Sequence, residues 1–234
     1  MAMDRSLTKG RIQIAPSIFS ADLSRLADEC SRIERYADLI HIDIMDGHFV
    51  PEISIGPKVA AAIRQVTKVP LDVHLLVEEP INLISELREA AVDRIAVHYE
   101  ANDDPLKVIR AIHDSGIEAG IALKGETEFA QVAPIAEEAD FILLLTIDPA
   151  DRSRNFYRDV CNKIYEIQEI YDSTSMPLIE VDGGIDDRSI GALREAGADI
   201  FVLGSYFFAA EDLESAVLAL RSDSQPGILN GSTA

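Results

Sequence analysis

The chain carries a histidine and an aspartate two positions apart inside a short apolar run, at His41 and Asp43. Side chains alternate between the two faces of a β-strand, so His41, Asp43 and Met45 would share one face. Ile42 and Ile44 would then pack on the opposite face. An imidazole and a carboxylate that point the same way provide half of a metal-binding site.

The other half of the site is predicted at the ends of two later apolar runs. His74 lies near the end of one run, and Asp182 closes another just before Gly183 and Gly184. A single histidine in such a run is more often a hydrogen-bonded core residue than a ligand. Two imidazoles and two carboxylates together suit one divalent ion such as Zn²⁺, Mn²⁺, Fe²⁺ or Co²⁺. We therefore predict one divalent metal ion as the cofactor.

The composition favours a single acidic domain. The chain has 234 residues, 47% of them hydrophobic, which is enough for one sizeable core. Its 41 acidic and 21 basic residues give a net charge of −20. This excess argues against binding to nucleic acid or to anionic membranes. An anionic substrate would need a local positive site, made by a metal ion, backbone N–H groups or a few arginines.

The cysteines and the apolar runs indicate a cytoplasmic location. The two cysteines, Cys30 and Cys161, lie in helix-like segments without zinc-site spacing, and no disulfide is expected between them. No apolar run approaches the length of a membrane span. The first residues lack the apolar core of a secretory signal.

Eight short apolar runs alternate with segments of helical patterning, which predicts parallel strands joined by helical crossovers. Eight such units in about 220 residues predict a single (β/α)₈ TIM barrel. A doubly wound sheet is the alternative, but no Gly-x-Gly-x-x-Gly follows the first run. The barrel is expected over residues 11–221, between an N-terminal extension (1–10) and a disordered tail (222–234). The predicted strands are 12–16, 39–45, 71–76, 94–98, 119–123, 141–147, 178–182 and 200–203.

The barrel predicts where a substrate would bind. Active sites of this fold lie at the C-terminal ends of the strands, and all four candidate ligands fall at or near such ends. Phosphate groups are often held by the loops after strands seven and eight. Here those loops contain Gly183, Gly184, Gly204 and Ser205, whose backbone N–H groups are predicted to bind a phosphate.

Several segments together resemble the ribulose-phosphate 3-epimerases and related phosphoketose epimerases, such as those acting on allulose 6-phosphate. The segment 41–51 is the most specific match, whereas Ala-Gly-Ala-Asp at 196–199 is common among phosphate-binding barrels. The resemblance implies that the four candidate ligands bind the metal and that Asp43 and Asp182 form an acid/base pair. It also implies a phosphorylated sugar as substrate and a homo-oligomer. The matching segments are 15–22, 41–51, 71–75, 97–100, 180–185 and 196–205.

The chemistry of this family explains the residue types. Epimerisation at C3 of a ketose phosphate, as between D-ribulose 5-phosphate and D-xylulose 5-phosphate, moves a proton from one face to the other. A divalent metal would stabilise the enediolate intermediate, and two carboxylates would act alternately as base and acid. Met45 would pack against the planar intermediate. Ser17 would donate a hydrogen bond to a substrate oxygen.

The chain departs from the family in the part of the site distant from the metal. The loop after strand six usually reads Pro-Gly-Phe-Gly-Gly-Gln, but residues 148–156 lack these glycines and contain Arg152 and Arg154. These arginines would replace the lost backbone contacts to an anionic group. Leu76 and Leu145 stand where the family has methionines. The exact phosphoketose is therefore left open.

Two alternatives belong to other functional classes. Lys124, at a position where the family has Asn-Pro, would form a Schiff base in an aldolase or lyase. The second alternative is a non-catalytic phosphosugar-binding protein in which the altered loop has abolished turnover. His98 and Glu100 are interpreted as structural residues in preference to members of the site.

Overall fold

The structure is a computed structural model that describes residues 12–101, 104–171, 175–186 and 188–221. Its eight strands are all parallel and form one sheet with the order β1-β8-β7-β6-β5-β4-β3-β2. The strands are β1 Gln13–Pro16, β2 Ile40–Met45, β3 Leu71–Leu76, β4 Arg94–His98, β5 Glu118–Leu123, β6 Phe141–Leu145, β7 Leu178–Asp182 and β8 Ile200–Leu203.

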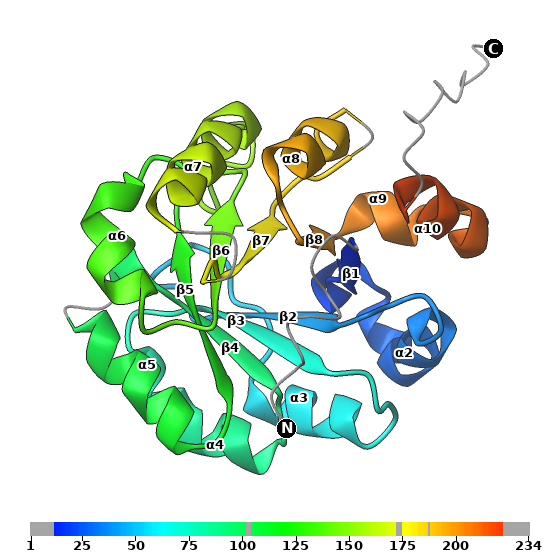
Figure 1. Cartoon of the computed structure of the whole chain (residues 1–234). Coiled ribbons are helices and arrows are strands. Elements are labelled where there is room, and N and C mark those ends of the chain that lie inside the picture. Colours follow the sequence, from blue (N-terminus) through cyan, green and yellow to red (C-terminus); the bar gives the residue numbers. More distant parts are fainter. Residues whose placement is uncertain (1–11, 102–103, 172–174, 187, 222–234) are drawn as a thin grey trace.

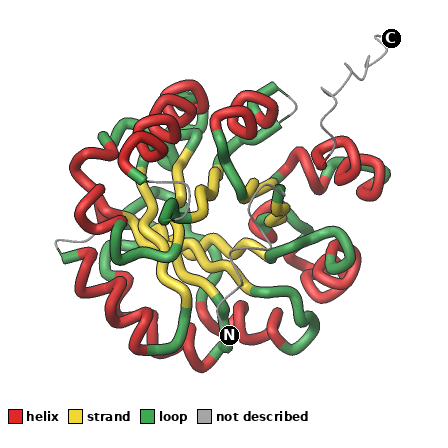
Figure 2. Tube along the Cα trace, viewed as in Figure 1, coloured by secondary structure: helices red, strands yellow, loops and turns green. Residues whose placement is uncertain are grey.

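Helices alternate with these strands and surround them (Figure 1), which confirms the predicted (β/α)₈ barrel. In Figure 2 the strands fill the centre and the helices form the outer ring. A parallel bridge between Ser17 and His41 links the two end strands, so the barrel is nearly closed. The helices are α2 Leu26–Ile33, α3 Pro57–Arg64, α4 Ile84–Glu89, α5 Pro105–Asp114, α6 Phe129–Ala136, α7 Tyr157–Ile170, α8 Ile190–Ala196, α9 Ser205–Phe208 and α10 Leu213–Arg221, with short 3₁₀ turns η1 Ile18–Ser20, η2 Leu23–Arg25, η3 Pro80–Leu83 and η4 Tyr99–Ala101.

The two faces of β2 pack as the alternation predicts. Ile42 and Ile44 belong to the large core cluster that the strands share with the surrounding helices. Met45 belongs to a separate apolar cluster that also contains Leu76 and Leu145. Full burial of a side chain such as Ile42 contributes roughly 1.5–3 kcal/mol. The register of β2, and hence the direction of its polar side chains, is therefore fixed by packing.

The strand predicted at 141–147 ends two residues earlier than expected. The Thr146 N–H donates to the carbonyl of Asp182 at 2.7 Å, and Ile147 forms an antiparallel bridge with Asn155. The first bond continues the pairing of β6 with β7, and the antiparallel bridge then joins Ile147 to the sixth loop. The expected extension at 1–10 and tail at 222–234 lie outside the described residues. Among the residues that are described, no helix is long and apolar enough to span a membrane.

Candidate metal centre and substrate cavity

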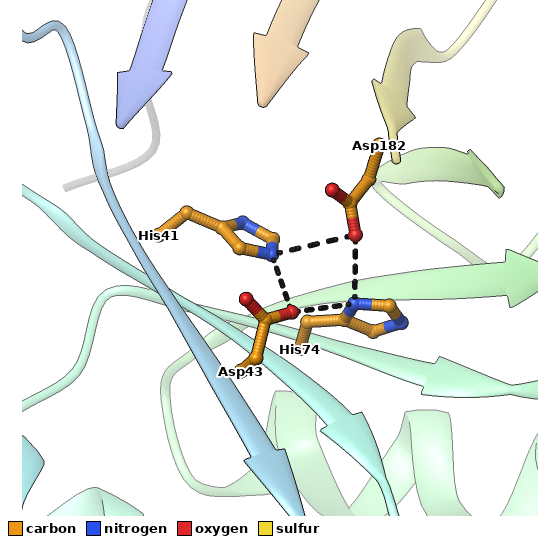
Figure 3. A group of neighbouring side chains, drawn as sticks. All are labelled: His41, Asp43, His74 and Asp182. Carbon is orange, nitrogen blue, oxygen red and sulfur yellow. Dashed lines mark ion pairs between the residues drawn. The ribbon is translucent and has the colours of Figure 1, made fainter. Parts of the chain in front are cut away.

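Four side chains from three strands of the barrel meet at one site. Strand β2 carries His41 and Asp43, β3 carries His74, and β7 ends at Asp182. In the parallel pairing of β2 with β3, Asp43 lies opposite His74. Figure 3 shows the four side chains pointing toward a common centre. The structure thus brings together all four residues selected from the sequence.

The donor atoms of these side chains are spaced as the ligands of one ion would be. Asp43 Oδ1 lies 3.3 Å from both His41 Nε2 and His74 Nδ1. Asp182 Oδ2 lies 3.4 Å from His74 Nδ1 and 4.0 Å from His41 Nε2. Ligand atoms about 2.1 Å from a tetrahedral ion are about 3.4 Å apart. Three of the four separations match this value closely.

Two buried nitrogen atoms at this centre lack hydrogen-bond partners. They are His41 Nε2 and His74 Nδ1, the ring atoms that face the two carboxylates. Leaving a buried polar atom unpaired costs about 1–3 kcal/mol. A divalent cation would give both lone pairs a partner and would balance the two carboxylates. The residues present therefore fit such an ion.

The charges around the histidines are those of a cation site. Burial by itself would lower the pKa of His74, but Asp182 and Asp43 more than offset it and raise that pKa to about 9. Burial likewise opposes ionisation of Asp43, yet His41 and His74 hold its pKa well below the usual range. Without an ion, protons on the histidines balance the carboxylates. A binding cation must displace these protons.

The ring of His41 is held from behind by a buried carboxylate. Its Nδ1 lies 2.8 Å from Asp72 Oδ2 and 3.4 Å from Glu180 Oε1. Arg94 lies in the same buried cluster, 3.0 Å from Glu180 and 3.7 Å from Asp72. Burial would raise the pKa of Asp72, but the Arg94 guanidinium and His41 keep it low. Because this carboxylate can only accept, the His41 Nδ1–H donates and Nε2 is left for the ion.

Sequence analysis missed this buried cluster, although the two-residue repeat of side chains along a β-strand could have indicated it. Asp72 precedes His74 by two positions, and Glu180 precedes Asp182 by two positions. Alternation therefore puts each carboxylate on the same strand face as a candidate ligand. Arg94 is 2% exposed and supplies the cation that these carboxylates need.

His98 and Glu100, interpreted from the sequence as structural residues, are connected to the candidate ligand His74 by hydrogen bonds. His98 Nε2 lies 2.9 Å from His74 Nε2, and His98 Nδ1 lies 2.9 Å from Glu100 Oε2. Burial and the neighbouring His74 lower the pKa of His98 to about 4, although Glu100 opposes them. His98 is therefore neutral at physiological pH.

A cavity of about 710 Å³ opens beside the four candidate ligands. The side chains of Met45, Leu76 and Leu145 give it an apolar wall. Ser17 also lines it, but its hydroxyl donates to Asp43 Oδ2 at 2.6 Å. Ser17 thus orients a candidate ligand in this structure. Also at this cavity are Asp43, Asp182, Gly183, Gly184, Gly204, Ser205 and Arg152.

The glycine loops after β7 and β8 approach neighbouring segments too closely for a side chain. Gly183 has a φ of +111°, and a Cβ there would lie 2.5 Å from Ile147 Cγ1. A Cβ at Gly204 would lie 2.8 Å from Ser20 Oγ. Both glycines also line the cavity, where the sequence predicted a phosphate site.

We expect Gly183→Ala to lower the free energy of unfolding by more than about 1 kcal/mol, because alanine is strained at this φ and would contact Ile147. Gly191→Ala is the matched control, since Gly191 lies in helix α8 and a Cβ there meets nothing within 4 Å. That change should stabilise the chain by about 0.5–1 kcal/mol. Urea unfolding of both variants checks the prediction, and equal midpoints would contradict it.

The two arginines of the sixth loop have different positions. Arg152 lines the cavity and forms an ion pair with Glu52, with 2.7 Å between Arg152 Nη2 and Glu52 Oε2. Arg154 pairs with Asp148 at 2.6 Å and is not among the described residues that line this cavity. Of the two, Arg152 is thus the one placed to meet a substrate.

Lys124 does not line the cavity beside the candidate ligands. Its Nζ lies 4.3 Å from the ring centroid of Phe49, and the residue lines a second cavity of about 590 Å³ together with Glu78 and Glu100. A lysine that forms a Schiff base must reach the substrate's carbonyl carbon. The geometry therefore does not favour the aldolase alternative.

Comparison with known proteins matches residues 13–208 to the family model described as "Ribulose-phosphate 3 epimerase family". The ribulose-phosphate 3-epimerase of Bacillus subtilis (strain 168) is 39% identical over 213 residues, covering 90% of this chain and 98% of the relative. That of Chlamydia trachomatis is 39% identical, covering 94% and 97%. The enzyme of Mycobacterium tuberculosis (strain H37Rv) is 38% identical, covering 89% and 91%.

Solved structures with much lower identity share the fold. A tryptophan synthase α-subunit from Pyrococcus furiosus has a TM-score of 0.68 and 14% identity, covering 91% of this chain and 98% of that one. Orotidine 5'-phosphate decarboxylase from Pyrococcus horikoshii has a TM-score of 0.60 and 15% identity, covering 89% and 97%. At such identities the likeness concerns the fold alone.

Proposed function

The chain belongs to the ribulose-phosphate 3-epimerase family and is a phosphoketose 3-epimerase, and we propose that it interconverts D-ribulose 5-phosphate and D-xylulose 5-phosphate or a closely similar pair. The observation that carries the proposal is the arrangement of Asp43 and Asp182. Both carboxylates line one cavity, and both adjoin the same pair of histidine nitrogens.

The proposed mechanism uses the two aspartates as base and acid. One carboxylate removes the C3 proton, and the other, in its protonated form, returns a proton to the opposite face. The two residues come from β2 and β7, which β1 and β8 separate in the barrel. They can therefore reach the reacting carbon from different sides. Ser17 holds Asp43 in place by donating to Oδ2.

The proposed ligands of the divalent ion are His41, Asp43, His74 and Asp182. When bound, the ion would supply positive charge that stabilises the enediolate as it forms. Zn²⁺, Mn²⁺, Fe²⁺ and Co²⁺ all suit two imidazoles and two carboxylates.

The remaining cavity residues are proposed to hold the rest of the substrate. Met45 is proposed to pack against the planar intermediate and, with the two leucines beside it, to keep water away. Backbone N–H groups of Gly183, Gly184, Gly204 and Ser205 are proposed to bind the phosphate. Helix α9 after Gly204 has only four residues, so its dipole contributes little.

The experiment that tests the function is a panel of phosphoketoses incubated with the enzyme in deuterated water. Deuterium at C3 of one substrate, together with formation of its C3 epimer, would support the proposal. Tight binding of a phosphosugar without exchange at C3 would instead indicate a non-catalytic relative.

Arg152 is expected to set the affinity for the anionic end of the substrate. Arg152→Ala should raise KM by about 10-fold or more, because a charge-assisted hydrogen bond contributes roughly 1.5–3 kcal/mol. The effect on kcat should be smaller if the contact is equal in ground and transition states. Arg154→Ala is the matched control, since Arg154 pairs with Asp148. Steady-state kinetics of both variants test this, and equal KM values would contradict it.

We further propose that the chain is a homo-oligomer in the cytoplasm, as the family resemblance suggests. Both cysteines are free thiols, Cys30 buried and Cys161 partly buried. Light scattering during size-exclusion chromatography would measure the oligomeric state, and a mass near 25.6 kDa would indicate a monomer.

A further inference from the structure

A chain of hydrogen bonds runs away from the metal centre behind His74. The His74 Nδ1 atom faces Asp43 and Asp182, whereas its Nε2 atom lies 2.9 Å from His98 Nε2. The other nitrogen of His98, Nδ1, lies 2.9 Å from Glu100 Oε2. Two ring nitrogens at this distance must share one proton, so one of them donates and the other accepts.

Glu100 is itself fixed at both of its oxygens. Oε1 accepts from the backbone N–H of Lys124 at 2.8 Å and from the hydroxyl of Thr127. Oε2 faces His98. Glu100 lies in η4 after β4, and Lys124 and Thr127 follow β5. The carboxylate therefore connects the ends of two strands and holds one position.

Glu100 determines which atom donates and which accepts in each hydrogen bond between Glu100, His98 and His74. An ionised carboxylate only accepts, so His98 Nδ1 must carry the proton that lies between them. Neutral His98 then has a lone pair on Nε2 and accepts from His74 Nε2–H. His74 is left with a lone pair on Nδ1, the atom that faces Asp43 and Asp182. His41 differs, because Asp72 contacts it directly and its Nε2 faces the centre.

The packing around His74 and His98 restricts their rings to this hydrogen-bonding arrangement. His74 and His98 are both fully buried, and their ring centroids lie 5.0 Å apart with an interplanar angle of 30°, so the rings meet edge to edge. Phe49 packs against His98, with 4.9 Å between the two ring centroids. Strands β3 and β4 are neighbours, with His74 opposite Ala96. His98 therefore lies on the face that His74 occupies, one strand further round the barrel.

We propose that Glu100 is a positioning residue that acts through His98 to fix the tautomer of His74, so that His74 Nδ1 is the metal-binding atom. The proposal rests on the ligand set of the proposed function. In this arrangement Glu100 is connected to the proposed metal site through His98 and His74. Carboxylates behind metal-binding histidines typically change metal affinity by 10- to 100-fold.

Glu100→Gln is the variant that separates the acceptor pattern from packing. Glutamine has nearly the same shape, but it offers one acceptor and one donor where Glu100 needs two acceptors. Whichever way the amide lies, it conflicts with either His98 Nδ1–H or the Lys124 N–H. Zn²⁺ affinity, measured by competition with a chromophoric chelator, should fall about 10- to 100-fold.

Glu79→Gln is the matched control for this experiment. Glu79 lines the same second cavity as Glu100, but it accepts from Asn82 and makes no contact with His98. Its variant removes the same charge close to the site and should keep the Zn²⁺ affinity within about twofold. An equal fall in both variants would mean that charge alone is responsible, and this would overturn the proposal.

A second measurement needs no variant and covers the case in which Glu100→Gln fails to fold. Long-range ¹H–¹⁵N spectra of the zinc-loaded wild-type protein report which imidazole nitrogens carry protons. We expect protons on His98 Nδ1 and His74 Nε2. A proton on His98 Nε2 would overturn the proposal.

His74→Ala distinguishes this inference from the proposed function. If that variant loses Zn²⁺ while Glu100→Gln keeps wild-type affinity, the ligand set stands and the role of Glu100 is wrong. If His74→Ala keeps full affinity, the ligand set itself is wrong, and the inference falls with it.

Discussion

Asp43→Asn and Asp182→Asn should each lower the rate of epimerisation by about 10²- to 10⁴-fold, the usual contribution of a positioned acid or base. An asparagine amide neither takes a proton from C3 nor returns one. Neither carboxylate can substitute for the other, because they reach the cavity from β2 and β7. Steady-state assays in both directions measure the loss.

The two variants should differ in the half-reaction that survives. Each retains one carboxylate, so each should exchange the C3 proton of only one epimer with deuterated solvent. Opposite epimers should be exchanged by Asp43→Asn and Asp182→Asn, as proton NMR would detect. Near-normal turnover in both directions for either variant would show that the two-aspartate assignment is wrong.

Metal content must be measured alongside, because both aspartates are also proposed ligands. The assays therefore use saturating Zn²⁺ or Mn²⁺, with metal analysis of each protein. Asp28→Asn is a suitable control, since Asp28 lies in helix α2 and its exposed carboxylate pairs with Arg25. That variant should keep the activity of the wild-type enzyme within a few-fold.

His74→Ala should reduce the metal content from one divalent ion per chain to almost none after dialysis. The loss should exceed the 10- to 100-fold typical of residues behind the ligands, because a direct ligand is removed. His113→Ala is the control, since His113 lies in helix α5 and pairs with Asp140 at 2.7 Å. Metal analysis of both proteins decides the question, and full retention of the ion in His74→Ala would refute the ligand set.

Metal removal should also lower the thermal stability of the wild-type protein. An ion present at 100 to 1,000 times its Kd stabilises the folded state by about 2.7–4.1 kcal/mol. For a chain of this size, that corresponds to a fall in Tm of roughly 5–15 °C after chelation. The same chelator should leave the Tm of His74→Ala unchanged, because that variant holds no ion to lose.

The sequence by itself determined the fold and the proposed ligands. Strand alternation predicts that His41 and Asp43 share a face opposite Ile42, and the structure has that arrangement. His74 and Asp182 were selected because they close later apolar runs, and the barrel rule agrees that such strand ends meet. These inferences succeeded because strand period and barrel topology depend on local pattern and chain order. Neither depends on the detailed shape of a loop.

The tertiary structure decided which residues stand behind the ligands. Asp72 behind His41 and the His98–Glu100 pair behind His74 depend on the register of neighbouring strands and on ring orientation. A sequence pattern fixes the face of a residue, but it does not determine which of two ring nitrogens meets which oxygen.

The tertiary structure also separated the two arginines that the sequence left equivalent, and it placed Lys124 away from the cavity beside the candidate ligands. Arg152 lines the cavity, Arg154 pairs with Asp148, and Lys124 lies against Phe49. Long cationic side chains follow the carboxylates and rings that they meet in space. Those partners, such as Glu52 for Arg152, come from distant parts of the chain. Only the folded barrel brings them together.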